Sequence, residues 1–377
     1  MALYKRLGSD GRTARWQVVI DIDDAGTGKR KRRVLGTYST KKIAEAEERK
    51  AFIDREQGTL LEKDTTSVAD LLDRWLADKA ATVTSNTIAD YRLVITKHIK
   101  PSPLGPMRIR KVTPAFLQGQ YMAWKDAGLS PRMIRGCHMR LSQAFDHAVR
   151  MKLLLHNPAK DVTAPRLPRA SFDHWNPDEA KVFLKAAQDD TYAPLWDILL
   201  REGMRRGEAL GLRWRDINWE AGSAHIVQSV VVDKNKAGGV LIQPRTKTKA
   251  GARTVQLTGG TLAALRALKD RRTWADNPAQ KPSPDRLIFS VRDGGPINPN
   301  NIVRNFNAII KAKKLRRIKV HELRHTAATL MLLAGVPAKV VSERLGHASI
   351  AITLDTYSHV LPSMQVDAAA AMDRLLG

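Results

Sequence analysis

The chain has 377 residues and carries 63 Lys and Arg against 38 Asp and Glu, a formal net charge of +25. This length suffices for two or three domains, and the charge favours a polyanionic partner, nucleic acid first. A single cysteine, Cys137, excludes a disulfide framework and a cysteine-rich zinc site, and we expect it in the core. No apolar run approaches the roughly 20 residues that cross a bilayer, and residues 1–10 lack a signal-peptide pattern. We therefore expect an intracellular protein that meets DNA directly and has no membrane partner.

Residues 1–63 are predicted to form a small basic β-sheet plus helix module. Residues 16–22 alternate partly, as a strand does. Five consecutive cations follow a turn, namely Lys29, Arg30, Lys31, Arg32 and Arg33. They either form a solvated hairpin tip or contact the DNA backbone, and the total charge of the chain favours DNA. A helix capped by Thr40 should follow. One face of this helix is expected to carry Ile43, Ala46 and Phe52.

Residues 64–165 are predicted to be all helix. Ser67, Thr113 and Ser130 precede apolar periodic segments as N-caps do, and the last two are followed by Pro, which suits a first turn. Three basic side chains of the last helix can line a DNA-facing surface, namely Arg132, Arg135 and Arg140. Residues 163–170 carry two prolines and two arginines without helical or strand period, which indicates an inter-domain linker.

Residues 172–377 are predicted to form a larger, mainly helical domain with a small antiparallel sheet. Residues 240–243 and 253–257 flank a polar stretch, which suggests a hairpin. The tail from residue 366 suits a short helix that packs either on its own core or on a neighbouring protomer. The fold class expected for the whole chain is therefore multidomain and mainly α, with α+β parts.

Two motifs carry residue types that handle phosphodiesters. In the first, Arg205 follows Gly203 near a predicted helix start, and Glu208 lies three residues on, where it can hold the guanidinium. In the second, His321 and Arg324 share a helix face, so both can reach one phosphate. Taken alone, each of these two pairs of residues is more often a pair of solvent-exposed side chains without a catalytic role.

The second motif continues towards the C-terminus. His325 points away from Arg324, and we expect packing or a supporting hydrogen bond there. His347 follows a predicted helix end, and Tyr357 lies ten residues further along. Histidine moves protons near neutral pH, and a tyrosine hydroxyl can act as a nucleophile.

Arg205, His321, Arg324, His347 and Tyr357, in this order, resemble the catalytic set of the tyrosine recombinase (phage integrase) family. The sequence motifs around these residues are similar to those of the family too: Gly-Met-Arg-Arg-Gly-Glu, His-Glu-Leu-Arg-His-Thr, Leu-Gly-His-Ala-Ser-Ile and Asp-Thr-Tyr-Ser-His-Val. The resemblance covers the chain end to end. It implies an arm-site DNA-binding module over residues 1–63, a SAM-like core-site-binding domain over 64–165 and a catalytic domain over 172–377.

The family's remaining catalytic group is a lysine in a β-hairpin. Reading forward from Pro244 favours Lys247, whereas reading back from Arg253 favours Lys249, and both stay open. The chain departs from the family at Glu202, where many members have Thr, and at Gln256, where a Pro often follows the strand.

The resemblance implies a site-specific recombinase that cuts and rejoins DNA through a covalent 3′-phosphotyrosine at Tyr357. Arg205 and Arg324 would clamp the phosphate, and a hairpin lysine would protonate the leaving oxygen. His321 and His347 would position the phosphate and assist proton transfer, and which of the two histidines, if either, carries the proton stays open. No metal and no cofactor are expected. The expected partners are double-stranded DNA at core and arm sites, three further copies in a homotetramer, and a directionality or host accessory factor.

The family setting implies a prokaryotic cytoplasm, at the nucleoid, and integration of a phage or other mobile element, with a part in its excision. Two other functions would use similar residues. One is a type IB topoisomerase that relaxes DNA, against which the extra N-terminal module argues. The other is a catalytically degenerate DNA-binding protein, against which the full set of catalytic residue types argues.

Overall fold

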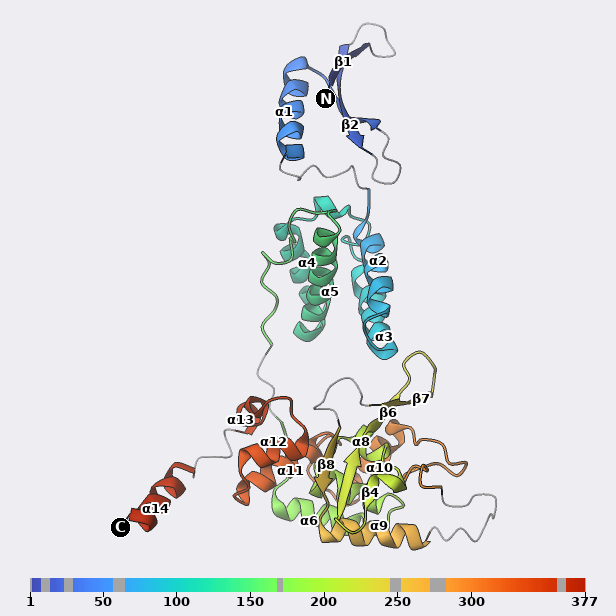
Figure 1. Ribbon diagram of the computed structural model, residues 1–377, viewed down its shortest axis with the longest axis vertical. Helices are drawn as coiled ribbons and strands as arrows, with labels where there is room; N and C mark the ends of the chain where they lie inside the picture. Colours follow the sequence, from blue (N-terminus) through green and yellow to red (C-terminus); the bar gives the residue numbers. More distant parts are fainter. Residues whose placement is uncertain are drawn as a thin grey trace. The chain divides into compact units, whose positions relative to one another are not determined.

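The computed structural model describes residues 2–7, 14–23, 30–56, 65–167, 172–244, 252–271, 283–357 and 364–376 (Figure 1). The chain divides into two compact units, Met1–Pro168 and Arg169–Gly377. The described parts are mainly helical with small antiparallel sheets, as the sequence predicts. The expected division into three domains stays a prediction.

The first unit begins with an antiparallel sheet in the order β1-β2-β3, followed by one helix. These elements are β1 (Ala2–Leu7), β2 (Ala14–Asp23), β3 (Arg30–Tyr38) and α1 (Lys41–Glu56). The cations from Arg30 to Arg33 belong to β3, where they pair with β2 residues from Asp23 back to Ile20. Residues 30–33 therefore begin a strand, directly after residues 24–29, which lie outside the described residues.

Helix α1 begins after Thr40, whose Oγ1 accepts a hydrogen bond from the Ile43 N–H at 3.4 Å. Its buried positions are Ala44 and Ala51, however, whereas Ile43 and Phe52 are about half exposed. The three residues predicted to share one face, Ile43, Ala46 and Phe52, are thus all exposed, and different residues form the packed face. Small residues let α1 approach β2 closely, and the larger apolar side chains remain at the surface.

The rest of the first unit is helical. Its elements are α2 (Val68–Ala80), α3 (Ser85–Val94), the π-helix η1 (Ile95–Ile99), the 3-10 helix η2 (Ile109–Lys111), α4 (Pro114–Asp126) and α5 (Pro131–Arg150). The side chains of Ser67, Thr113 and Ser130 cap α2, α4 and α5 as predicted, each accepting a backbone N–H. Cys137 is fully buried in the core of this unit, also as predicted.

The second unit surrounds one large hydrophobic core. Its helices are α6 (Pro177–Ala186), α7 (Ala193–Arg201), α8 (Arg206–Leu210), the 3-10 helix η3 (Trp214–Asp216), α9 (Gly259–Arg271), α10 (Pro299–Ala312), α11 (Glu322–Leu333), α12 (Ala338–Leu345), α13 (Ile350–Tyr357) and α14 (Met364–Leu376). Four aromatic rings meet at the centre of the core, namely Trp175, Phe183, Trp196 and Phe306. This packing fixes α6, α7 and α10 against one another.

The strands of the second unit form two small sheets, and this corrects the predicted hairpin. One sheet has the order β4-β5-β8, with β4 (Ile217–Asn218), β5 (Ser223–Ile226) and β8 (Arg253–Gln256). The other pairs β6 (Gln228–Val232) with β7 (Val240–Pro244). Segments 240–244 and 253–256 thus pair with different partners and not with each other. Local alternation identified the strands, but it holds no information on their distant partners.

Candidate active site

Arg205 lies at the turn between α7 and α8, as the sequence predicts. It is the N-cap residue of α8, and its Nη1 donates to Glu208 Oε1 at 2.7 Å. Its Nη2 also donates to the Gly346 carbonyl at 3.4 Å. The Glu208 side chain is 1% exposed, whereas that of Arg205 is 36% exposed. A buried carboxylate therefore orients Arg205 while part of the guanidinium stays accessible.

Arg324 reaches the same place from the first turns of α11. Its guanidinium is buried and donates to two backbone carbonyls, Gly203 O at 2.9 Å and Leu345 O at 2.6 Å. Gly203 makes this approach possible. Its φ is +67°, and a Cβ there would lie 2.6 Å from Leu345 Cδ2. The end of α7, α11 and the end of α12 thus converge on one arginine.

The two arginines make the site a place of concentrated positive charge. Burial first, and then the nearby Arg205, lower the pKa of Arg324 to about 9. Arg324 nevertheless remains protonated at neutral pH. An anion bound beside both guanidinium groups would relieve their mutual repulsion, so the pair suits a phosphate.

Two of the predicted histidines border these arginines. His347 follows Gly346, which ends α12 with a left-handed φ of +68°, and its Nδ1 lies 2.8 Å from Thr353 Oγ1. Burial, and then Arg324 and Arg205, lower the pKa of His347 to about 4. His321 precedes α11 and remains partly accessible to solvent. Desolvation by the neighbouring side chains, and then Arg324 and Arg205, lower the pKa of His321 too. Both imidazoles are therefore neutral at pH 7 in the absence of a bound anion.

Tyr357 is the last residue of α13 and is buried, with 2% of its surface exposed. Its Oη lies 2.6 Å from His325 Nδ1. Burial raises the pKa of Tyr357 to about 12, and Arg324 acts in the opposite direction. The expected supporting hydrogen bond of His325 is thus present, and it is made to the candidate nucleophile itself.

Arg253 at the start of β8 is a third arginine of this site, and sequence reasoning used it only to place a hairpin. Its Nη2 donates to Glu208 Oε2 at 2.7 Å and its Nε to the Arg344 carbonyl at 3.1 Å. Its side chain is 9% exposed. Despite the burial of Glu208, Arg253 and then Arg205 hold the pKa of Glu208 down at about 2. One carboxylate therefore links both cations, and Arg253 supports Arg205 through it.

The departure from the family at Glu202 has a structural counterpart. This carboxylate is fully buried and accepts hydrogen bonds from Thr258 N at 2.9 Å and Thr261 Oγ1 at 2.7 Å. It also forms an ion pair with Arg344. Glu202 thus ties the end of α7 to α9 and α12, and α12 carries two of the carbonyls bound by Arg253 and Arg324. At the other departure, the side chain of Gln256 donates to the Ala221 carbonyl.

Other predicted site residues lie elsewhere or cannot be placed. Lys247 and Lys249 both fall outside the described residues, and so does Lys29. On α5, Arg132 and Arg135 are exposed. Arg140 on the same helix is half-buried, with its guanidinium 4.4 Å from the centre of the Tyr91 ring.

Neither a metal cluster nor a membrane span is found among the described residues. No group of three or more His, Cys, Asp or Glu side chains within the described ranges is arranged to hold a metal ion. No helix in these ranges is long and apolar enough to cross a membrane.

Comparison with known protein families agrees with the geometry. Residues 175–364 match the model described as Phage integrase family, and residues 67–125 match the model described as Phage integrase, N-terminal SAM-like domain. The first match alone spans half of the chain. The chain therefore belongs to the phage integrase family of site-specific tyrosine recombinases.

Individual relatives are similar over most of their length. The ICEBs1 integrase of Bacillus subtilis is 27% identical over 368 residues, covering 96% of this chain and 98% of the relative. The "Tyrosine recombinase XerC-like" protein of Caldanaerobacter subterraneus is 26% identical over 352 residues, covering 89% of this chain and 90% of that protein.

Two solved structures share the fold. The Tn1549 transposon integrase in complex with a circular intermediate DNA has a TM-score of 0.68 at 22% identity, covering 82% of this chain and 99% of that one. A λ integrase tetramer bound to a Holliday junction has a TM-score of 0.59 at 18% identity, with 94% of each chain covered.

Proposed function

We propose that this recombinase integrates a phage or other mobile element, and takes part in its excision, through a covalent 3′-phosphotyrosine at Tyr357. The observation that carries the proposal is the convergence of α7, α11, α12 and α13 on Arg205, Arg324 and Tyr357. Arg324 bonds to carbonyls at the ends of α7 and α12, and its charge lies close enough to lower the pKa of Tyr357. The nucleophile and the phosphate-binding cations therefore belong to one assembled site.

In the proposed cleavage step, Tyr357 attacks the scissile phosphate and the 5′-oxygen leaves. Negative charge grows on the non-bridging oxygens, and Arg205 and Arg324 stabilise it from fixed positions. His321 and His347 contact the phosphate and assist in its orientation. Lys247 or Lys249 protonates the leaving oxygen. The energy of the broken bond is kept in the phosphotyrosine, so the 5′-hydroxyl of a second duplex reverses the step without ATP.

We propose that the first unit holds the DNA while the second unit carries out the chemistry. The cations of β3, residues 30–33, would contact phosphates of arm sites, whereas Arg132 and Arg135 on α5 would contact the core site. Two rounds of strand exchange in a homotetramer would then pass through a Holliday junction. The likeness to the λ integrase tetramer supports this assembly, and so does the likeness to integrase–DNA complexes.

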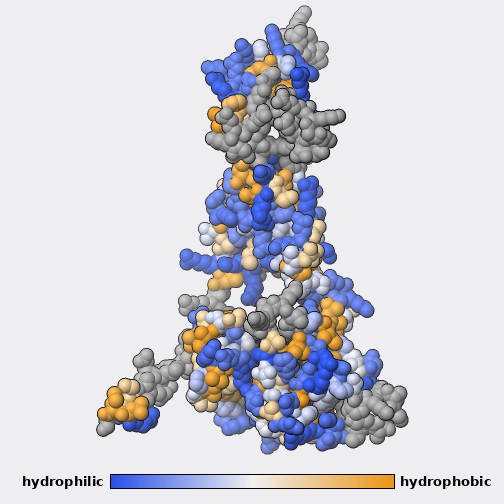
Figure 2. Space-filling model, in the orientation of Figure 1, coloured by the Kyte–Doolittle hydropathy of each residue, from blue (hydrophilic) through white to orange (hydrophobic). Residues whose placement is uncertain are grey.

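The C-terminal helix offers a means of assembly. In the described part of α14, Met372, Leu375 and Leu376 are all more than half exposed, and Figure 2 colours this segment as hydrophobic. We propose that α14 docks on a neighbouring protomer rather than on its own core. Two of its leucines stay exposed by more than three quarters of their surface, which a partner would cover.

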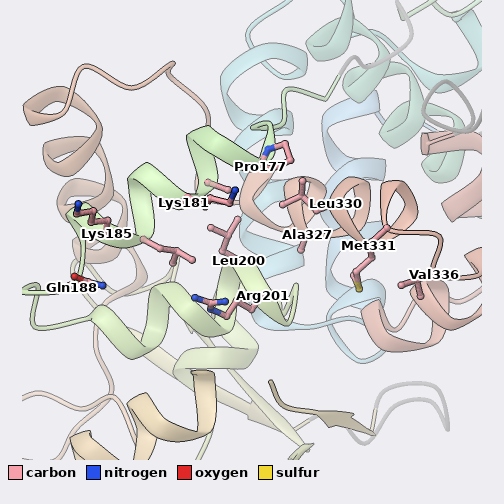
Figure 3. A pocket seen from close by; sticks show the side chains of 13 residues that line it. Pro177, Lys181, Lys185, Gln188, Leu200, Arg201, Ala327, Leu330, Met331 and Val336 are labelled. Atoms are coloured by element: carbon pink, nitrogen blue, oxygen red, sulfur yellow. The ribbon is translucent and has the colours of Figure 1, made fainter. Parts of the chain in front are cut away.

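A groove between α6, α7 and α11 is a suitable receptor for this helix (Figure 3). It has a volume of about 570 Å³ and an apolar floor that includes Leu184, Leu200 and Leu330. Basic residues line it as well, namely Lys181, Lys185 and Arg201. An amphipathic helix docking in a groove buries its apolar face in this way.

Removing the tail tests the proposed assembly. Deletion of residues 366–377 should impair synapsis of two core sites much more than binding to one. Leu330→Gln in the groove should act in the same direction, whereas Leu333→Gln, at a position 60% exposed on the same helix, serves as the control. Native-gel separation of single-site and paired complexes measures both. Unchanged pairing in the deletion variant would show that α14 packs on its own protomer.

Replacement of the nucleophile tests the proposed chemistry. Tyr357→Phe should abolish the covalent protein–DNA adduct on a nicked suicide substrate that contains the correct site, while DNA binding stays close to wild type. Adduct formation by this variant would refute the role of Tyr357. Failure of the wild type to form any adduct would instead favour a DNA-binding protein without catalysis, and relaxation of plasmids that lack the site would favour a topoisomerase.

A further inference from the structure

We propose that His325 is a catalytic residue that accepts the phenolic proton of Tyr357 during cleavage and returns it during strand joining. The inference rests on the proposed role of Tyr357 as nucleophile. Its structural basis is the 2.6 Å separation between His325 Nδ1 and Tyr357 Oη, which is within the range of a proton-transferring hydrogen bond. The sequence predicts only a supporting role for His325, because this residue points away from Arg324, and its contact with Tyr357 joins residues 32 positions apart.

The imidazole is held with Nδ1 directed at the phenol. The Phe172 ring stacks on His325, with 4.2 Å between centroids and 23° between planes. On another side the His321 ring meets it edge to face, at 5.4 Å and 88°. Because two rings restrict its plane, His325 is pre-positioned with respect to Tyr357.

Burial and the surrounding charges keep His325 neutral, which is the form that accepts a proton. Burial contributes most to lowering its pKa to about 4, and the remaining contributions come from His321, Arg324, His347 and His174. The ring is therefore neutral at pH 7. Since Nδ1 faces a hydroxyl that must lose its proton, the reactive tautomer carries its hydrogen on Nε2.

Tyr357 needs such an acceptor. With a pKa of about 12, it would be ionised in only about one molecule in 10⁵ at pH 7. Within the described residues, no hydrogen bond joins its Oη to His321 or His347, and His347 Nδ1 is engaged by Thr353 Oγ1. A positioned general base accelerates a step of this kind by about 10²–10⁴-fold.

The proton balance of the step is complete in both directions. In cleavage, the bond from Tyr357 Oη to phosphorus forms, the bond from phosphorus to O5′ breaks, and the phenolic proton passes to His325 Nδ1. The proton that reaches O5′ comes from a different donor, the lysine of the proposed function. In joining, a 5′-hydroxyl attacks phosphorus and loses its proton to the now neutral lysine, the bond from phosphorus to Tyr357 Oη breaks, and the His325 imidazolium gives its proton back to the departing phenolate oxygen.

The most direct test compares His325→Asn with His325→Ala in single-turnover cleavage of a suicide substrate at saturating DNA. Asn can place an acceptor near the position of Nδ1 but cannot take up a proton, so both variants should be slower by about 10²-fold or more. DNA affinity should be unchanged. His225→Asn is the control, because His225 Nδ1 also contacts a hydroxyl, Thr254 Oγ1, but on an exposed strand pair. A rate for His325→Asn within about threefold of wild type would overturn the proposal, because His325 would then only hold the phenol in place.

A substrate with sulfur in place of the bridging 5′-oxygen separates the two proton transfers. A thiolate leaves without protonation, so the substitution should remove the need for the leaving-group acid and leave the defect of His325→Asn unchanged. Recovery of His325→Asn on this substrate would assign His325 to the leaving group and overturn the proposal. Tyr357→Phe should form no adduct with either substrate, and an adduct there would refute the proposed function itself.

The pH dependence of cleavage provides a further test. Cleavage should lose rate as the pH falls through about 4, where His325 becomes protonated. Because the pKa of His347 is also lowered to about 4, the fall should be smaller in His325→Asn than in the wild type, since only one of the two titrations remains. A wild-type rate that stays level through this range would overturn the proposal.

Discussion

Two groups of arginines in this molecule differ in how they are held. In the second unit, Arg324 and Arg253 are buried and bonded to carbonyls or a carboxylate from distant parts of the chain. On α5, Arg132 and Arg135 are exposed, and Arg135 donates to the Pro165 carbonyl at 3.4 Å. Fixed cations can stabilise a transition state without reorganising, whereas exposed cations can follow a DNA backbone. We therefore expect substitutions in the first group to affect rate and those in the second to affect affinity.

The largest effect should come from Arg324→Lys. A lysine cannot contact the carbonyls of Gly203 and Leu345 and a phosphate together, as the planar guanidinium can. Single-turnover cleavage at saturating DNA should fall by about 10³-fold. Arg266→Lys, at an exposed position on α9, is the matched control. If Arg324→Lys lost affinity for DNA but cleaved at an unchanged rate, the buried arginines would not differ in role from the exposed ones.

A smaller effect on rate is expected where an arginine acts through another. Arg253→Gln and Glu208→Gln should each slow cleavage by about 10²-fold, because Glu208→Gln removes the charge that holds Arg205, and Arg253→Gln removes the cation that fixes the Glu208 carboxylate. The double variant should be little slower than either single variant, since both act on the same contact. Measurement of all four cleavage rates completes the cycle. If the rate reductions of the two single variants multiplied in the double variant, Arg253 would act independently of Glu208.

The smallest effects should come from the exposed group. Arg132→Gln and Arg135→Gln should weaken DNA binding several-fold and reduce the slope of affinity against salt concentration by about 1 each. Arg140→Gln should change that slope less, because Arg140 packs on the Tyr91 ring. Titrations at several salt concentrations give the slopes. An equal change for all three would show that Arg140 also contacts phosphate.

The sequence predicted those parts of the structure that depend on near neighbours. Ser67, Thr113 and Ser130 identified helix starts because a cap bonds to an amide only three residues away. The bond between Arg205 and Glu208 was predictable for the same reason. The order of the motif residues along the chain then indicated the family before any contact was known.

Contacts between distant residues could not be predicted in this way. Arg253 binds Glu208, 45 residues before it, and the Arg344 carbonyl, 91 residues after it. The partners of β7 and β8 and the bond from His325 to Tyr357 also depend on how the chain folds back on itself. Strand alternation and helix spacing describe one element at a time, and they therefore missed the contacts that join elements and the role of Arg253 in them.

The central claim is that Tyr357 forms the covalent link to DNA. After trapping on a suicide substrate, digestion with trypsin and nuclease should yield a peptide that carries a 3′-linked nucleotide residue. Mass spectrometry of this peptide should place the modification on Tyr357, in the tryptic segment that follows Arg344. Attachment to any other side chain, or to a 5′-phosphate, would contradict the proposed mechanism.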